Sequence, residues 1–149
     1  MPNDRPLDVP RDRCYERDRH LWLQRDEGSG RVRVGIDAIG LESLGELVYV
    51  TLRDVGTTVV RGESVGSLEA AKMTSAVLAP VGGTLIARND AVLRDPRLAN
   101  EDPYARGWLF ELEPSAWEEE AAALVSGEAV AAWAAAEIGR LREETSADR

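Results

Sequence analysis

Between residues 20 and 113 the chain consists of short apolar or alternating segments separated by glycine-containing turns. Residues 31–36 alternate basic or small side chains with apolar ones, which is typical of a half-buried strand. Residues 47–52 are apolar almost throughout and indicate a buried strand, whereas residues 108–113 alternate again. With 149 residues the chain has the length of one ordinary domain. The pattern therefore predicts a mainly β fold with one core.

Two local features refine this prediction. Residues 20–24 have strand character and are joined to the strand at 31–36 by a glycine-rich turn, so we expect a hairpin. Residues 38–44 predict a short helix that ends at Gly45, because glycine readily adopts the conformation that closes a helix.

The two ends of the chain differ from the middle. Residues 1–13 contain three prolines among charged side chains, so we expect a flexible lead that buries nothing. The β sandwich should occupy residues 14–114 and a polar tail residues 143–149. Between them, at 115–142, we expect helices near 116–124 and 127–142 that pack on the sandwich through Trp117 and Trp133, because apolar stripes with large aromatic residues are usually core.

The composition excludes several classes of function. The formal net charge is −9, which disfavours nucleic-acid binding and a membrane-surface role, since both need a basic surface. No apolar run is long enough to span a bilayer, and the N-terminus lacks the apolar segment of a secretory signal, so a cytoplasmic location is expected. Cys14 and His20 are the single cysteine and histidine, which argues against an internal disulfide and a metal site. The chain also shows no nucleophile–base pair, so we expect no catalytic residue of its own.

The chain contains a single lysine, Lys72, beside 17 arginines. Coding bias towards arginine accounts for most of the depletion, but it does not explain why one lysine remains. Arginine replaces lysine where only a charge is needed, but not where a primary amine must be acylated. Lys72 is therefore the first candidate for a functional side chain.

The segment around Lys72 gives conflicting local signals. Residues 68–73 are strong helix formers, and propensity alone predicts a short helix. Residues 64–68 and 76–83, however, have strand character on either side, and the second ends in a turn. These flanks favour a hairpin with Lys72 at its tip.

A series of motifs over roughly residues 15–125 resembles the glycine cleavage system H-protein family. The lipoylation motif of that family, Glu-Ser-x-Lys-Ala-x-Ser, matches Glu69-Ala70-Ala71-Lys72-Met73-Thr74-Ser75. The other matches, in chain order, are His20-Leu21-Trp22, Val34-Gly35-Ile36, Leu44-Gly45-Glu46-Leu47-Val48-Tyr49-Val50, Val55-Gly56, Pro80-Val81-Gly82-Gly83 and the Pro-x-Leu-x-Asn-x-x-Pro-Tyr-x-x-Gly-Trp-Leu pattern at 96–109. Each piece is short, but their order and spacing agree with the family.

The resemblance implies an antiparallel β sandwich of the lipoyl/biotinyl type, a barrel-sandwich hybrid, with lipoate attached to Lys72 through an amide. It implies a carrier that serves a pyridoxal-phosphate glycine decarboxylase, a folate-dependent aminomethyltransferase and a flavin dihydrolipoamide dehydrogenase. A lipoate ligase or lipoyltransferase would attach the group. Glu69 is then either recognised by that ligase or merely keeps the hairpin soluble, and Met73 is either a ligase contact or an ordinary apolar flank.

Departures from the family pattern leave alternatives open. Ala70, Ala71 and Met73 replace the family's Ser, Val and Ala around the lysine, and Ala-Lys-Met approaches the Met-Lys-Met of biotin carriers. The C-terminal helices are also longer than the family leads us to expect. Three alternatives remain: a similar lipoyl carrier for another system such as lipoate-dependent sulfur oxidation, a biotin carrier, and an unmodified scaffold.

Overall fold

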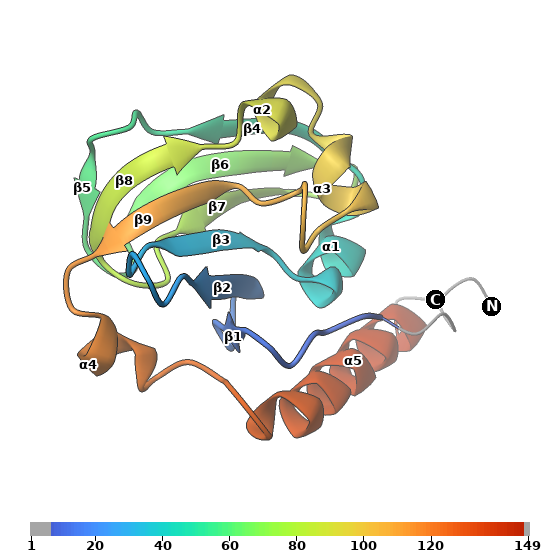
Figure 1. Ribbon diagram of the computed structural model, residues 1–149. Coiled ribbons are helices and arrows are strands. Elements are labelled where there is room, and N and C mark those ends of the chain that lie inside the picture. The colour runs from blue at the N-terminus through green and yellow to red at the C-terminus, as the bar shows by residue number, and fades with distance from the viewer. Residues whose placement is uncertain (1–6, 148–149) are drawn as a thin grey trace.

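Nine strands form two antiparallel sheets within residues 7–147, the part of the chain that the computed structural model describes. The larger sheet has the order β1-β2-β3-β9-β8-β5, and the smaller has the order β4-β6-β7. Figure 1 shows the smaller sheet behind the larger one. The strands are β1 (Cys14–Tyr15), β2 (Leu21–Arg25), β3 (Val32–Ile36), β4 (Leu47–Leu52), β5 (Thr58–Val59), β6 (Ser64–Ala70), β7 (Thr74–Leu78), β8 (Gly83–Arg88) and β9 (Phe110–Pro114).

Five helices lie at the ends and along one side of these sheets. They are α1 (Ala38–Leu44), α2 (Asp90–Arg94), α3 (Arg97–Glu101), α4 (Trp117–Ala121) and α5 (Ala129–Ala147). The bounds of α1 and β4 are those predicted from the sequence, whereas the last strand begins at Phe110 instead of residue 108.

The main core lies between the two sheets. Alternate side chains of β3, Val32 and Val34, are fully buried and belong to one apolar cluster with Val50 of β4 and Leu68 of β6. Alternation places one face of each strand in this core and the other towards solvent. The predicted lipoyl-type β sandwich is therefore confirmed.

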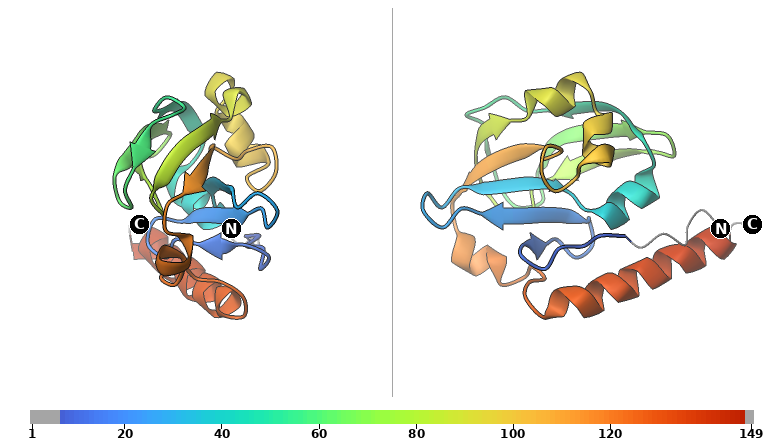
Figure 2. Two further views of the ribbon diagram at one scale, coloured as in Figure 1. Left: turned by 60° about the vertical axis from the view of Figure 1, so that its left-hand side comes forward. Right: turned by 45° about the vertical axis from the view of Figure 1, so that its right-hand side comes forward.

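A second apolar cluster holds α5 against the outer side of β1 and β2. Figures 1 and 2 both place α5, in red, along this side of the molecule. Its centre is formed by Tyr15, Trp22 and Trp133, which are at most 9% exposed. The Trp133 ring lies 5.3 Å from that of Tyr15, and its indole N–H donates to the carbonyl oxygen of Arg17 at 3.3 Å. Trp133 therefore has the predicted anchoring role, and Trp117 packs partly buried against the main core.

The prediction that residues 1–13 bury nothing is wrong for the described part of that segment. Leu7 and Val9 pack against the second cluster. The Arg13 guanidinium lies 4.9 Å from the Trp22 ring and 5.2 Å from the Tyr104 ring, where cation–π attraction stabilises it. Residues 1–6 lie outside the described range.

The C-terminal helices also differ from the prediction in their bounds. The first is a single turn that ends at Ala121, and the second begins at Ala129 and continues to Ala147. Residues 143–147 are therefore helical instead of belonging to a polar tail, because the helix has no breaker after Arg142. Residues 148 and 149 lie outside the described range.

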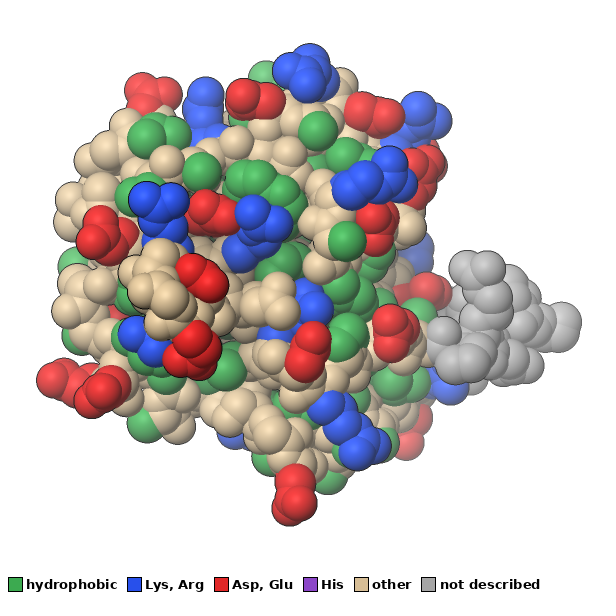
Figure 3. Space-filling model, viewed as in Figure 1, with side chains coloured by type: hydrophobic (Ala, Val, Ile, Leu, Met, Phe, Trp, Pro, Cys, Tyr) green, Lys and Arg blue, Asp and Glu red, His purple; other side chains and the backbone are tan. Residues whose placement is uncertain are grey.

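Charges of both signs are interspersed on the face seen in Figure 3. Ion pairs join charged side chains across strands or turns of the molecule, such as Arg33 with Glu111 at 2.8 Å and Arg106 with Asp102 at 3.0 Å. The arginines therefore form no concentrated basic patch on this face. Within residues 7–147, no helix is both long and apolar enough to cross a membrane.

The second cluster yields a prediction for stability. Replacing Trp133 by alanine should lower the free energy of unfolding by about 3 kcal/mol, because the cavity left by a buried aromatic ring does not fully collapse. For a chain of this length that corresponds to a fall of about 10 °C in Tm, measured by circular dichroism. Trp117→Ala is the matched control and should lower the free energy of unfolding by less, because Trp117 is only partly buried. Equal Tm values for wild type and Trp133→Ala would contradict the anchoring role of Trp133.

Candidate functional site

Lys72 lies at the tip of the β6–β7 hairpin. The last cross-strand pair is Glu69 with Thr74, and the Ala70 amide donates to the Met73 carbonyl oxygen at 2.9 Å to close the turn. The Lys72 side chain is exposed. The predicted hairpin is thus confirmed, and the helix that propensity favours does not form.

The backbone of this turn is bonded to the turn between α1 and β4. The Lys72 amide donates to the Leu44 carbonyl oxygen at 3.1 Å, and the Ala71 amide donates to the Glu46 carbonyl oxygen at 2.9 Å. The Lys72 Nζ donates to the Glu42 carbonyl oxygen at 3.0 Å. These bonds attach the hairpin tip to the end of a helix, so the turn has a defined position in spite of its exposure.

Gly45 makes this close approach possible. Its φ of 82° lies in the left-handed region, where side chains are strained. A Cβ at this position would come within 3.3 Å of Ala71 Cβ and 3.4 Å of Lys72 Cγ. The contact between the two turns therefore requires glycine on conformational grounds and has little room for a side chain.

Asn100, in α3, supports the α1–β4 turn from the other side. Its Oδ1 accepts from the Leu47 amide at 2.9 Å, and its Nδ2 donates to the Gly45 carbonyl oxygen at 3.1 Å. The sequence alone predicts no particular role for the Asn100 side chain. Its place in the motif at 96–109 was the available signal, but only the tertiary structure brings residues 55 positions apart together.

Loss of the Asn100 amide should loosen the Lys72 turn. In Asn100→Ala both bonds disappear, so hydrogen exchange at the Lys72 amide should accelerate about tenfold, because one or two bonds contribute about 1–2 kcal/mol. Asn100→Asp is the matched control: it retains the acceptor for Leu47 and loses the donor to Gly45, and it should give an intermediate rate. Exchange would be measured residue by residue by NMR. Unchanged exchange at Lys72, together with a lower Tm, would restrict Asn100 to a general structural role.

An apolar groove of about 290 Å³ lies beside the hairpin. Its wall includes Met73, which is 51% exposed, and its rim includes His20. The other lining residues are Asp18, Arg19, Leu21, Ile36, Gly40, Ser43, Leu44, Leu68, Ser75, Ala76, Val77 and Leu78. A second hollow of about 380 Å³ includes Lys72 itself, Glu42, Gly45 and Asn100. The wider hollow at the β2–β3 hairpin, about 820 Å³, includes no residue of the Lys72 turn.

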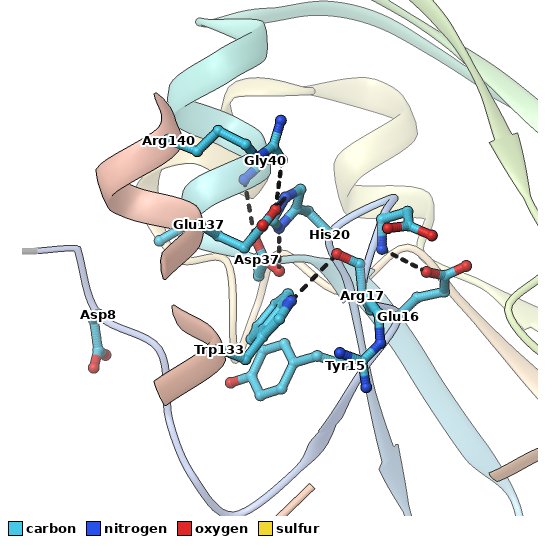
Figure 4. Close-up of polar contacts among 12 residues, drawn as sticks. Asp8, Tyr15, Glu16, Arg17, His20, Asp37, Gly40, Trp133, Glu137 and Arg140 are labelled. Atoms are coloured by element: carbon cyan, nitrogen blue, oxygen red, sulfur yellow. Dashed lines mark hydrogen bonds and ion pairs between the residues drawn. The ribbon is translucent and has the colours of Figure 1, made fainter. Parts of the chain in front are cut away.

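His20, which lines the groove, also lies between α5 and the start of α1. Figure 4 shows its contacts with Glu137 and Asp37. Its Nε2 lies 2.9 Å from Glu137 Oε1 on α5, and its Nδ1 lies 3.3 Å from Asp37 Oδ2. Asp37 is fully buried and caps α1 by accepting from the Gly40 amide at 2.8 Å. The His20 ring also stacks on Trp133 at 5.5 Å. His20 is thus both a hydrogen-bonded structural histidine and a residue of the groove.

The surroundings of His20 favour its protonated form. Burial lowers the pKa of the ring, but the hydrogen bonds and charges of Asp37 and Glu137 outweigh burial, so the pKa is raised overall. Burial raises the pKa of Asp37, and its bond to His20 opposes that shift. Arg140, whose guanidinium lies 2.6 Å from Glu137, lowers the pKa of the Glu137 carboxyl and keeps it ionised.

The raised pKa predicts a pH-dependent contribution of His20 to stability. The contribution is fully present below the unfolded-state value of about 6.5 and is lost as the pH rises through the folded-state value. The difference in Tm between wild type and His20→Asn should therefore shrink from pH 6 to pH 9 in thermal unfolding. Asparagine suits this position because it tolerates the positive φ of 58°. Glu137→Gln should weaken the pH dependence. A Tm difference that stays constant over this range would contradict the charge-based explanation.

The three residues singled out from the sequence lie on one hairpin. Glu69 ends the exposed side of β6, Lys72 is at the tip, and Met73 begins the return towards β7. The structure therefore brings them together. The roles suggested for Glu69 and Met73 remain predictions.

Comparison with known proteins gives consistent matches. The family model described as glycine cleavage H-protein matches residues 13–137. A glycine cleavage system H protein of Cronobacter sakazakii is 42% identical over 121 residues, which are 81% of this chain and 92% of the relative. A glycine cleavage system H protein of Mycolicibacterium vanbaalenii is 44% identical over 106 residues, which are 71% of this chain and 79% of the relative. The crystal structure of a glycine cleavage system H protein from Mycobacterium marinum is similar with a TM-score of 0.67 and 40% identity, covering 72% of this chain and 87% of that one.

Proposed function

The chain belongs to the glycine cleavage H-protein family, and from this membership we propose that it carries lipoate joined by an amide to Lys72. The observation that carries the proposal is the position of the single lysine at an exposed hairpin tip, within the segment that resembles the family's lipoylation motif. An acylating enzyme needs a primary amine that it can reach from outside. No other side chain of this sequence supplies one.

The surroundings of Lys72 fit such a group. The groove beside the hairpin has leucine, isoleucine, valine and methionine side chains in its wall, which suit a hydrocarbon arm. When attached, lipoate supplies a disulfide that carries an aminomethyl group and, once reduced, two reducing equivalents. The chain itself has one cysteine, Cys14, and therefore no dithiol of its own. Binding and presentation are the tasks left to the protein.

Hydrogen bonds around the tip fix the position of Lys72. The Glu42 carbonyl oxygen accepts one N–H of Nζ at 3.0 Å. The amides of Ala71 and Lys72 are already bonded to the α1–β4 turn, so little backbone freedom is lost when an enzyme binds the tip. In this proposal Glu69 is recognised by the attaching enzyme and Met73 contacts it.

The proposed partners follow from the family. A lipoate ligase or lipoyltransferase attaches the group, and the carrier then serves a pyridoxal-phosphate glycine decarboxylase, a folate-dependent aminomethyltransferase and a flavin dihydrolipoamide dehydrogenase. Carriers of this kind are not enzymes, and catalysis resides in the partners. A cytoplasmic location is part of the proposal.

The site assignment has a direct test. Lipoate ligase with ATP and lipoate should add one lipoyl group to the wild type, and none to Lys72→Arg, because a guanidinium stays protonated and is a poor nucleophile. The variant should fold normally, since an exposed substitution usually changes stability by less than about 0.5 kcal/mol. Intact mass before and after treatment measures the modification, and circular dichroism checks the fold.

The outcomes separate the alternatives. Equal mass gain in both proteins would contradict the assignment of Lys72. Modification by a biotin ligase but never by a lipoate ligase would indicate a biotin carrier. If neither variant is modified, and protein from the native host is also unmodified, the unmodified scaffold is the alternative that remains. Lipoylated protein that fails to support glycine–bicarbonate exchange would point to another lipoate-dependent system.

A further inference from the structure

Large exposed apolar side chains gather near the Lys72 turn. Among the side chains that the structure describes, five large apolar ones are more than half exposed, and three of these are Val48, Tyr49 and Met73. Met73 follows Lys72 directly, and Tyr49 pairs across the sheet with Glu69, three residues before Lys72. The other two, Val55 and Val60, lie on the connection between β4 and β6, away from the tip.

We propose that the outer face of the β4–β6–β7 sheet beside the turn is the docking surface for the enzyme that attaches lipoate. This inference rests on the proposed function and adds the surface that the attaching enzyme recognises. We call the region the Tyr49 surface and define it as Val48, Tyr49, Ser67, Glu69 and Thr74.

The sheet register places these side chains on one face. Tyr49, Glu69 and Thr74 are paired across β4, β6 and β7, so they form one row, and all three are exposed. The next row towards the interior of the sheet contains Val50 and Leu68, which are buried in the core. The alternation shows that the Tyr49 row points outward, and its exposure shows that no helix covers it.

A β-bulge adds Val48 to this face. The register between β4 and β6 shifts between Leu47 and Tyr49, so Val48 has no partner on β6. In a regular strand two consecutive side chains point to opposite faces, but a bulge turns both outward. Val48 and Tyr49 are accordingly 61% and 56% exposed. Two neighbouring apolar side chains in water contribute little to folding, which points to a partner that covers them.

The chemistry of attachment selects the attaching enzyme as that partner. The amide bond forms at Nζ, so this enzyme must bring its acyl donor to the hairpin tip itself. Enzymes that act on the carried group meet it at the far end of a long arm and need not contact the root. A stable interface covers about 800 Å² on each partner, more than a four-residue turn offers, so the attaching enzyme must also contact the flanking surface.

The composition of the Tyr49 surface suits such an interface. Tyrosine is among the residues that contribute most to binding when buried at the centre of a contact. Exposed Glu69 places a carboxylate on this surface. A partner with basic side chains around an apolar contact is complementary to it.

The test compares steady-state lipoylation of full-length variants by lipoate ligase with ATP and lipoate. In the double variant Val48→Thr, Tyr49→Thr, the KM for the carrier should rise at least tenfold while kcat changes less than twofold, because the acylated amine is untouched. Threonine retains strand propensity, and Tm should stay within a few degrees of wild type. Val60→Thr, at a residue that is 68% exposed and lies away from the tip, is the matched control and should leave KM unchanged.

The outcomes distinguish this inference from the proposed function. An unchanged KM in the folded double variant would overturn the docking surface while leaving Lys72 as the modified residue. A normal KM combined with impaired turnover by the glycine decarboxylase would also overturn it, because the surface would then serve a different partner. Failure of the wild type to be lipoylated at all would contradict the proposed function instead.

Discussion

The attachment of the Lys72 turn to the α1–β4 turn is the interaction on which the candidate site depends. The sequence from 68 to 73 favours a helix, but a helix there would lose the pairing of β6 with β7 and the burial of Leu68 and Val77 in the core. In the hairpin, the Lys72 amide donates to the carbonyl of Leu44 at the end of α1, and the Ala71 amide donates to the carbonyl of Glu46 in the turn that follows. The strand pairing, the buried side chains and the bonded amides all stabilise the hairpin over the helix, so tertiary contacts outweigh local helix propensity.

A second set of contacts connects this turn to the C-terminal helix. Trp133 packs on Tyr15 and His20, and Glu137 bonds to His20. His20 bonds in turn to Asp37, which caps the first turn of α1. The last residue of that helix, Leu44, accepts a hydrogen bond from the Lys72 amide. The helix at the end of the chain thus contacts one end of α1, and the Lys72 hairpin contacts the other. Contacts of α5 therefore reach the helix that positions the Lys72 turn, although the two segments are far apart in sequence.

The features that could be predicted from the sequence were those with a local cause. The strand at 47–52 and the helix at 38–44 followed from apolar periodicity and a closing glycine, and both have the expected bounds. Features with a distant cause were missed: Leu7 and Val9 are partly buried because they pack against the cluster that includes α5, and Asn100 meets Gly45 only in the folded chain. The hairpin at Lys72 is intermediate, because its flanking strands were visible but its turn residues favoured a helix. Family resemblance decided that case where periodicity did not.

The replacement of nearly every lysine by arginine has a consequence for specificity. An enzyme that acylates amines meets one lysine on this protein, so discrimination among lysines is unnecessary. Discrimination between this protein and others is still required, and a four-residue turn offers few distinguishing contacts. Specificity must then come from the surface that flanks the turn, where differences in affinity arise from both apolar contacts and charge. A rigid sheet face with two outward apolar residues meets that requirement better than a mobile loop, because little conformational entropy is lost when a rigid surface binds.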